Sequence, residues 1–405
     1  MTAPPPRRGT AESLAARNAC RLTTGELSPG AMSQSDLLAA IGAATTYGLG
    51  PALYSRLRGS GHTGTDPAWR GLASDYRQCA ARYLMLRSAF GRLQTALSAA
   101  GIPTIWLKGI ALAHTIHSDP ASRPMADLDL LVPAQQHRDA VEVVRSAGFE
   151  SPLSPEFGVV GESGHHIGLQ DSAPGGVNAE VHRALALGSG SMHGSDDLTW
   201  FWDRTLSVSA GPLSFLTLTP EAHLAYLSAH GLIHHSEDEF SLLRYLDIHL
   251  LLAHYPNLDW HDAISGAVRH GWGLALRRTL ALATDWFGSA VPAAATSELA
   301  QALATTSLRQ FERPRRHIFN GATAALDTRA MVGTGRWLAI LARLLAPTPE
   351  YMQWRYSPSG RLALAGAYVR RWSQLPALVA PVFATSARRG LESARRTLAG
   401  RRAPD

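Results

Sequence analysis

The stretch "IWLKGIALAHTIHSDPASRPMADLDLLV", residues 105–132, carries the most informative pattern in the chain. It predicts a short buried strand, a short helix, a loop with two prolines, and a second strand in which aspartate alternates with leucine. It also contains Lys108, the only lysine among the 38 Lys and Arg residues of the protein. A strand–helix–strand unit of this kind predicts a small mixed α/β core.

The second strand places two acids on one side of the sheet. Residues i and i+2 of a strand face the same way, so Asp127 and Asp129 project together while Leu128 and Leu130 point into a core. Two adjacent carboxylates repel each other unless a cation lies between them. Hard divalent ions such as Mg²⁺ (or Mn²⁺) take carboxylate and phosphate oxygens as ligands. The alternation therefore predicts a metal site at Asp127 and Asp129.

A third carboxylate is expected from a neighbouring strand. The segments "GHHIGLQD", residues 164–171, and "VNAEVHRAL", residues 177–185, flank "SAPGG" and predict two strands joined by a turn. Glu180 lies in the middle of the second segment, between Ala179 and Val181. We expect Glu180 to complete the metal site and to accept the proton of an attacking hydroxyl group.

Cationic and glycine residues surround the acidic strand in the sequence. Lys108 and Gly109 close the first predicted strand and open the first helix. Glycine allows a phosphate to approach the backbone, and the N-terminus of a helix favours anions. The Lys108 ammonium would balance the charge of a triphosphate. Arg123, four residues before Asp127, is expected either to contact the same phosphates or to pair with an aspartate.

The flanking regions have a helical pattern, so the expected fold class is α+β. We expect three regions: a helical N-terminal region over residues 1–100 with a loose start, a mixed core over 101–190, and a helical C-terminal region over 191–405 with a basic tail. Ser35 or Asp36 is expected to cap an early helix, and Gly101 to end the long helix before the core.

Composition limits the classes of protein. The net charge of +6 is modest for 405 residues, and the 45% hydrophobic share is ordinary for a folded chain. Two cysteines provide neither a disulfide framework nor metal spacing. We see no apolar run long enough to span a membrane and no signal peptide, and therefore expect a cytoplasmic protein. The Arg-rich end is expected to be a solvated helix end, and nucleic acid is not an expected partner.

The whole set of motifs resembles a known family. It is similar to the uncharacterised nucleotidyltransferase family of the DNA-polymerase-β-like superfamily. The resemblance rests on Leu107-Lys108-Gly109, on Arg123-Pro124, on the acidic strand from Asp127 to Val132, on Glu180 with His182, and more loosely on His230 and on Arg244, Tyr245 and Asp247. The close match covers about 45 residues, and a looser one covers about 150.

The resemblance implies a fold, a donor and a class of acceptor. It implies a minimal nucleotidyltransferase core with Mg²⁺ on the acidic strand and an NTP as donor, and it adds His182 to the nucleotide site. Members often lie beside genes for natural products and modified peptides, which implies a small molecule or peptide as acceptor. One departure is clear: the broader superfamily has Gly-Ser or Gly-Gly where this chain has Lys108 and Gly109.

Other polar residues leave alternatives open. His230 and His234 are spaced as zinc ligands on a helix, but Gly231 stands where a zinc protease has glutamate, so a structural or substrate-contacting role is expected. The histidine pair in "GHHIG" is a candidate for metal binding but is not assigned to a site. Arg244 and Asp247 are expected either to form a buried ion pair or to line the nucleotide cleft.

The resulting hypothesis is a Mg²⁺-dependent enzyme that moves a nucleotidyl (or phosphoryl) group from an NTP to a hydroxyl group. Its nucleotide-binding residues are predicted to be Lys108, Gly109, Arg123, His182, Arg244 and Asp247. Two other classes remain compatible with the sequence. The chain could be a catalytically silent NTP- or peptide-binding partner in a biosynthetic complex, or an enzyme that modifies nucleic acid with the help of its Arg-rich tail.

Overall fold

The fold is taken from a computed structural model, which describes the chain in defined stretches. It covers residues 9–305 except 65, 151–165, 174, 186–197, 212 and 235–239, together with 5–6, 349, 352, 360–370 and 372–373. Residues 1–150 and 165–314 belong to one compact unit, which contains every element discussed below. In a second unit, a helical segment at residues 361–370 buries Ala367 in a small cluster that also includes Met352. The Arg-rich tail and the "HSED" loop lie outside the described residues.

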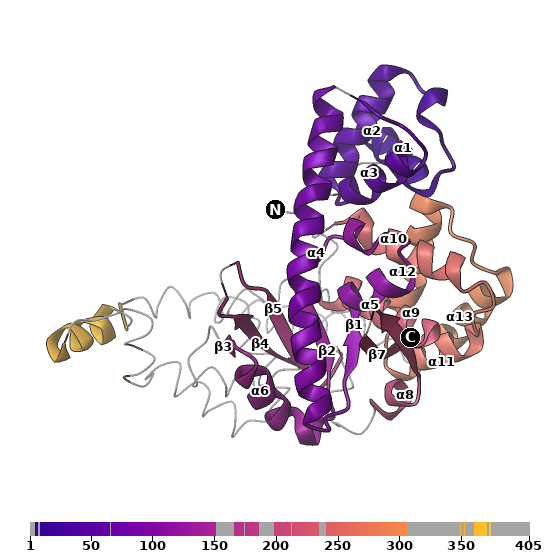
Figure 1. The fold of residues 1–405 in the computed structure, drawn as a ribbon. Helices are drawn as coiled ribbons and strands as arrows, with labels where there is room; N and C mark the ends of the chain where they lie inside the picture. Colours follow the sequence, from indigo (N-terminus) through magenta and orange to yellow (C-terminus); the bar gives the residue numbers. More distant parts are fainter. Residues whose placement is uncertain are drawn as a thin grey trace, which may run out of the picture. The chain divides into compact units, whose positions relative to one another are not determined.

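Four helices form the N-terminal region: α1 (Ala11–Thr24), α2 (Gln34–Thr46), α3 (Gly50–Gly59) and α4 (Pro67–Ala99). The expected cap of α2, Ser35 or Asp36, was wrong by two or three residues, because the hydroxyl oxygen of Ser33 accepts the backbone N–H of Asp36 at 3.2 Å. Gly101 follows the end of α4 with φ 67, as expected of a glycine at that position. In Figure 1, α4 runs from the small helices α1–α3 to the sheet.

Within the part of the chain that the structure describes, seven strands form one mixed sheet with the order β3-β4-β5-β2-β1-β7-β6, which confirms the α+β class. The strands are β1 (Ile105–Leu107), β2 (Asp127–Leu131), β3 (Phe149–Glu150), β4 (His166–Asp171), β5 (Asn178–His182), β6 (Thr205–Ala210) and β7 (Leu213–Leu218). Strand β1 pairs antiparallel with β2, and β2 pairs parallel with β5. The two segments on either side of "SAPGG" do form an antiparallel hairpin, β4–β5, as the sequence predicted.

The hairpin β6–β7 differs from the sequence-based expectation of helix after residue 190. It pairs antiparallel over Thr205–Ala210 and Leu213–Leu218, and β7 adds to the sheet beside β1 in parallel orientation. The alternation in "TLSVSA" followed by Gly211, which has φ 64, is the local signal that would have predicted it. The sheet therefore extends on both sides of β1.

Helices connect and cover the strands. Between β1 and β3 lie α5 (Lys108–Thr115) and α6 (His137–Ser146), and α8 (Thr199–Trp202) precedes β6. The C-terminal helices of this unit are α9 (Pro220–Ala229), a π-helical turn at His230–His234, α10 (Leu242–His254), α11 (Trp260–Arg269), α12 (Gly273–Phe287) and α13 (Ala293–Thr305). Among the described residues, no helix is both long enough and apolar enough to cross a membrane.

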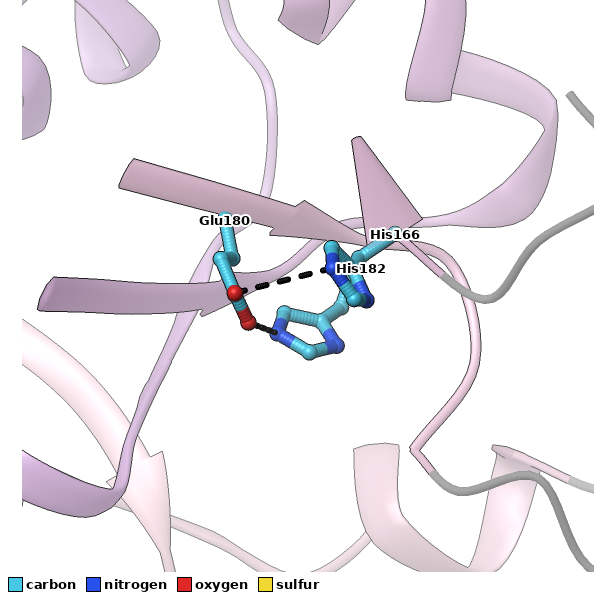
Figure 2. A group of neighbouring side chains, drawn as sticks. All are labelled: His166, Glu180 and His182. Atoms are coloured by element: carbon cyan, nitrogen blue, oxygen red, sulfur yellow. Dashed lines mark ion pairs between the residues drawn. The ribbon is translucent and has the colours of Figure 1, made fainter. Parts of the chain in front are cut away.

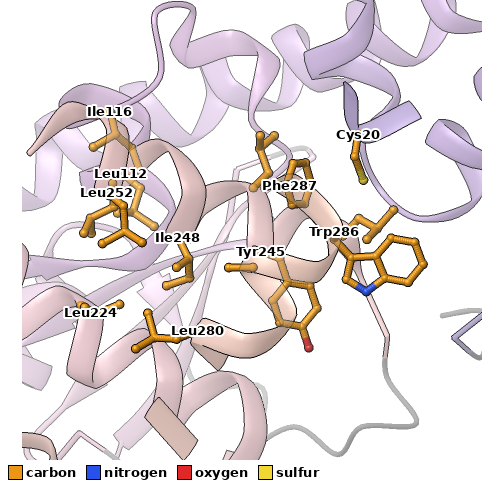
Figure 3. Close-up of a cluster of buried hydrophobic side chains, with 14 of the residues drawn as sticks. Cys20, Leu112, Ile116, Leu224, Tyr245, Ile248, Leu252, Leu280, Trp286 and Phe287 are labelled. Atoms are coloured by element: carbon orange, nitrogen blue, oxygen red, sulfur yellow. The ribbon is translucent and has the colours of Figure 1, made fainter. Parts of the chain in front are cut away.

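Two apolar clusters hold these layers together. One joins α5, α9, α10 and α12 to the N-terminal helices and includes Ile248, Leu280 and Phe287 (Figure 3). The other lies between the sheet and α4 and includes Leu128 and Leu130, both fully buried. The leucines of the acidic strand therefore pack into a core on one face, which leaves the aspartates on the other, as the alternation predicted.

The turn of the β4–β5 hairpin provides a test of the fold. A Cβ atom at Gly176 would lie 2.1 Å from the carbonyl oxygen of Asp171, so the backbone must shift to admit a side chain. We expect Gly176→Ala to lower the free energy of unfolding by about 1–3 kcal/mol. The matched control is Gly71→Ala in α4, where an added Cβ meets no described atom within 4 Å. This change should raise the stability by about 0.5–1 kcal/mol. Equal denaturant midpoints for the two variants would contradict the geometry of the turn.

Candidate active site

Lys108 occupies a strained position at the junction of β1 and α5. Its φ is 44, and among the described residues it is the only one other than glycine with positive φ. This left-handed conformation costs an L-residue about 1–2 kcal/mol. In this conformation the ammonium group makes two contacts: Nζ lies 2.6 Å from Oδ1 of Asp129 and 3.0 Å from Nε2 of His230. Backbone strain of this kind is concentrated at functional sites.

The two aspartates of β2 differ in their surroundings. Asp129 is 2% exposed, and its Oδ1 also accepts a hydrogen bond from Nε2 of His182 at 3.1 Å. Burial opposes ionisation, but Lys108 and His182 together hold the pKa of Asp129 below its usual range. Asp127 is only partly buried, and burial together with the neighbouring Asp129 charge raises the pKa of Asp127 to about 6. Asp129 is therefore held in its ionised form, whereas burial and the neighbouring charge disfavour the ionised form of Asp127.

Strand β5 brings Glu180 and His182 to the same face. Because β2 and β5 are parallel and Asp129 pairs with Glu180 in the register, the two carboxylates project from adjacent strands. His182, two residues further along β5, is 2% exposed. Burial opposes the ionisation of Glu180, but the nearby His182 imidazole lowers the pKa of Glu180. Asp127, Asp129, Glu180, Lys108 and His182, all assigned to the site from the sequence, are thus brought together.

His166 was not assigned to the site from the sequence, yet it lies in it. It begins β4 and pairs with His182 in the antiparallel register, so both imidazoles lie on the face of Glu180. Figure 2 shows the Glu180 carboxylate to one side of the two neighbouring rings, with an ion pair drawn to each. The Nε2 atom of His166 is 3.6 Å from Oε1 of Glu180, and Nε2 of His182 is 3.4 Å from Oε2. The spacing of the "GHHIG" and "AEVH" segments about one hairpin turn could have revealed this cluster.

Among the described residues, no side chain faces Glu180 across the β4–β5 pair. Its cross-strand partner in β4 is Gly168, and a Cβ atom at that glycine would meet no described atom within 4 Å. Partners in a cross-strand pair point to the same face, so the missing side chain leaves room next to the Glu180 carboxylate.

The predicted nucleotide residues Arg123 and Asp247 form a buried pair with each other. Nε and Nη2 of Arg123 donate to the two carboxylate oxygens of Asp247 at 3.0 and 2.7 Å, and Nε2 of His117 donates to Oδ1 at 2.9 Å. Arg123 is 8% and Asp247 3% exposed. Of the two outcomes expected for Arg123, the structure shows the pairing with an aspartate. The ion pair considered between Arg244 and Asp247 was wrong in its partner.

The π-helical turn after α9 connects the helical layer to the site. It begins at His230, whose imidazole contacts Lys108, and the guanidinium of Arg244 donates to the carbonyl oxygen of Gly231 in the same turn at 3.2 Å. Arg244 therefore supports the backbone that carries His230. The side chain of His234 lies outside the description. Insertions of this type inside helices are common at functional sites.

Gly109 has a packing reason to lack a side chain. A Cβ atom there would lie 2.9 Å from the Met125 side chain and 3.2 Å from Nη1 of Arg123. The residue that follows the lysine must therefore be small if the loop before β2 is to pack against α5. No side chain of the described residues caps the N-terminus of α5, whose first N–H groups remain available to an anion.

The donor set fits a divalent cation. Asp127, Asp129 and Glu180 supply carboxylate oxygens from adjacent strands, and the repulsion that raises the pKa of Asp127 is what a bound cation would relieve. Phosphate groups held on such an ion would meet the Lys108 ammonium from the neighbouring strand end. Enzymes of phosphoryl and nucleotidyl transfer use carboxylates and a lysine in this arrangement.

Comparison with known proteins agrees with this class. The model of the uncharacterised nucleotidyltransferase family matches residues 33–288, more than half of the chain, and the protein therefore belongs to that family. Membership makes the protein a transferase of nucleotidyl groups and confirms the resemblance seen in the sequence. No curated protein and no solved structure matches the chain.

Proposed function

We propose that the protein transfers a nucleotidyl group from an NTP to a hydroxyl group of a small molecule or peptide. The observation that carries the proposal is the shared face of Asp127, Asp129 and Glu180, with the strained Lys108 directed at Asp129. The two aspartates and Glu180 would hold Mg²⁺ or Mn²⁺, which supplies charge neutralisation at the phosphates when bound. The natural-product setting implied by the family resemblance favours a small molecule or peptide as acceptor.

Each residue of the site has a role in the proposed step. The acceptor oxygen attacks the α-phosphorus of the NTP, and the bond between this phosphorus and the bridging oxygen breaks. Pyrophosphate leaves with the bonding electrons. Glu180, on the open side of the sheet next to Gly168, takes the proton of the acceptor hydroxyl. Lys108 and the N-terminus of α5 neutralise the triphosphate.

Three predicted nucleotide-binding residues, Arg123, Asp247 and Arg244, act indirectly in this proposal. The buried pair of Arg123 and Asp247 ties the loop before β2 to α10, and so fixes where the acidic strand begins. Arg244 holds the turn that carries His230, and His230 in turn contacts the lysine. Neither guanidinium is required to touch the nucleotide.

The first test is calorimetric titration of each NTP in the presence of Mg²⁺. Wild-type protein should bind at least one NTP, and the binding should require the metal. It should be lost in Asp127→Asn/Asp129→Asn and weakened about tenfold or more in Lys108→Ala, because a charge-assisted contact contributes about 1.5–3 kcal/mol. The control is Asp139→Asn on the exposed side of α6, which should bind as the wild type does.

The outcomes separate the candidate functions. Metal-dependent NTP binding without release of pyrophosphate, for any acceptor of a broad panel, would favour a silent binding partner. Transfer to RNA or DNA alone would favour a nucleic-acid-modifying enzyme. Absence of NTP binding by folded wild-type protein would contradict the proposal.

A further inference from the structure

We propose that His166, Glu180 and His182 form a binding site for a divalent transition-metal ion, of the class of Zn²⁺ or Co²⁺, at the edge of the active site. The cluster comes from two strands of one hairpin and has two nitrogen donors and one carboxylate (Figure 2). The inference does not depend on nucleotidyl transfer, although the site would share Glu180 with the proposed Mg²⁺ site.

The distances within the cluster fit ligands around an ion better than direct hydrogen bonds. Charge-assisted N–H···O bonds usually close to about 2.7–2.9 Å. The two imidazole nitrogens lie 3.6 and 3.4 Å from the two oxygens of Glu180. Two ligands that are each about 2.1 Å from a tetrahedral ion are about 3.4 Å apart. One ligand atom from each of the three residues can be chosen so that all lie within 4.8 Å of one another.

The donor types select the kind of ion. Mg²⁺ prefers oxygen ligands and keeps its waters, whereas imidazole favours zinc, cobalt, nickel and copper. Two imidazoles and one carboxylate, with a fourth position left for water or phosphate, is a ligand set that catalytic zinc sites use.

The surroundings of the cluster leave room for an ion to approach, and Lys108 contacts Asp129 rather than the three ligands. The space next to Gly168 opens beside Glu180, so an ion can approach from this side of the sheet. The side chain of His166 is 25% exposed, and that of Glu180 is 27% exposed. Nε2 of His182 also contacts Oδ1 of Asp129 at 3.1 Å, and an ion would replace this contact. Asp129 would keep a second partner, because Nζ of Lys108 lies 2.6 Å from the same oxygen. The lysine thus screens the acidic strand from the second ion.

The test is metal titration of the chelator-treated full-length protein in the absence of nucleotide. We expect one Co²⁺ per chain with visible ligand-field bands, and calorimetric Zn²⁺ binding at least about 100-fold tighter than that of Mg²⁺. His166→Ala should weaken Co²⁺ and Zn²⁺ binding about 100-fold or more, since even the loss of an outer hydrogen-bonding partner costs 10- to 100-fold. His166→Asp should reduce the ratio of the Zn²⁺ affinity to the Mg²⁺ affinity.

The matched control is His261→Ala. His261 also pairs with a glutamate, with 2.7 Å between its Nδ1 and Oε1 of Glu298, but on the surface and outside the cluster. This variant should bind metal as the wild type does. Because His166 is partly exposed, its variants are expected to fold, and circular dichroism would check this. Glu180→Gln is a second variant that removes one ligand of the proposed site. Undiminished Co²⁺ binding in folded His166→Ala, or equal affinity for Mg²⁺ and Zn²⁺, would overturn the proposal. NTP binding is measured in a separate titration, so a failure of the transition-metal proposal can be distinguished from a failure of the proposed nucleotidyl transfer.

Discussion

Replacing Asp129 by asparagine is expected to lower nucleotidyl transfer by about 10³-fold or more. The carboxylate is ionised, buried and central to the site, because it lies between Lys108 and His182 and next to Glu180 in the register. Metal-assisted stabilisation of a phosphoryl group contributes several kcal/mol, and each 1.36 kcal/mol corresponds to a tenfold change in rate. Asparagine keeps the shape of the side chain and removes its charge.

The measurement is release of labelled pyrophosphate and of labelled NMP from the NTP that the titration identifies. Until an acceptor is identified, water serves as the acceptor, and the assay measures hydrolysis of the NTP to NMP and pyrophosphate. The variant also leaves the buried Lys108 ammonium without its carboxylate, so a loss of activity could arise from unfolding. The double variant Asp129→Asn/Lys108→Met removes both charges. It should restore the denaturant midpoint toward the wild-type value without restoring activity. Recovery of activity in the double variant would contradict the proposed role of Asp129.

Replacing Asp247 by alanine is expected to have the largest effect on stability, a loss of about 3–5 kcal/mol. The substitution leaves the buried Arg123 guanidinium and the His117 imidazole without their common acceptor. The control is Asp262→Ala, which breaks the more exposed pair with Arg204, where the side chains are 29% and 23% exposed. This loss should be about 1 kcal/mol. Denaturant unfolding measures both, and similar values would contradict the assignment of a buried ion pair.

The stability difference between wild type and Asp247→Ala should also depend on pH. Burial opposes ionisation, but Arg123 and His117 hold the pKa of Asp247 below its ordinary value of 3.8. A carboxyl group with a lowered pKa in the folded state contributes its full stabilisation above its unfolded value and loses it as the pH falls further. The difference should therefore be constant from neutral pH to about pH 5 and shrink at more acidic pH. A difference that grows on acidification would contradict the assigned ionisation.

The local pattern of the sequence determined the acidic strand and the β4–β5 hairpin. In a strand the side chains alternate between faces, so "DLDLLV" predicts that Leu128 and Leu130 are buried opposite the two aspartates, and both of these leucines are fully buried. The family was also apparent from the sequence, because the motifs that match it closely lie within residues 107–132 and at Glu180 and His182. The hairpin β6–β7 carried an alternating signal as well, which the helical texture around it concealed.

The tertiary structure decided which residues meet. The Arg123–Asp247 pair joins positions 124 apart in the chain, and Lys108 contacts His230 over a separation of 122 residues. The order of strands and the packing of α9 and α10 set these contacts, because hydrophobic periodicity specifies which face of an element is buried but not what it is buried against. The same holds for His166, whose place beside Glu180 follows from the register of β4 on β5. The sequence by itself therefore predicted the carboxylates together with Lys108 and His182, and the folded chain determined that His166 lies beside Glu180 and His230 beside Lys108.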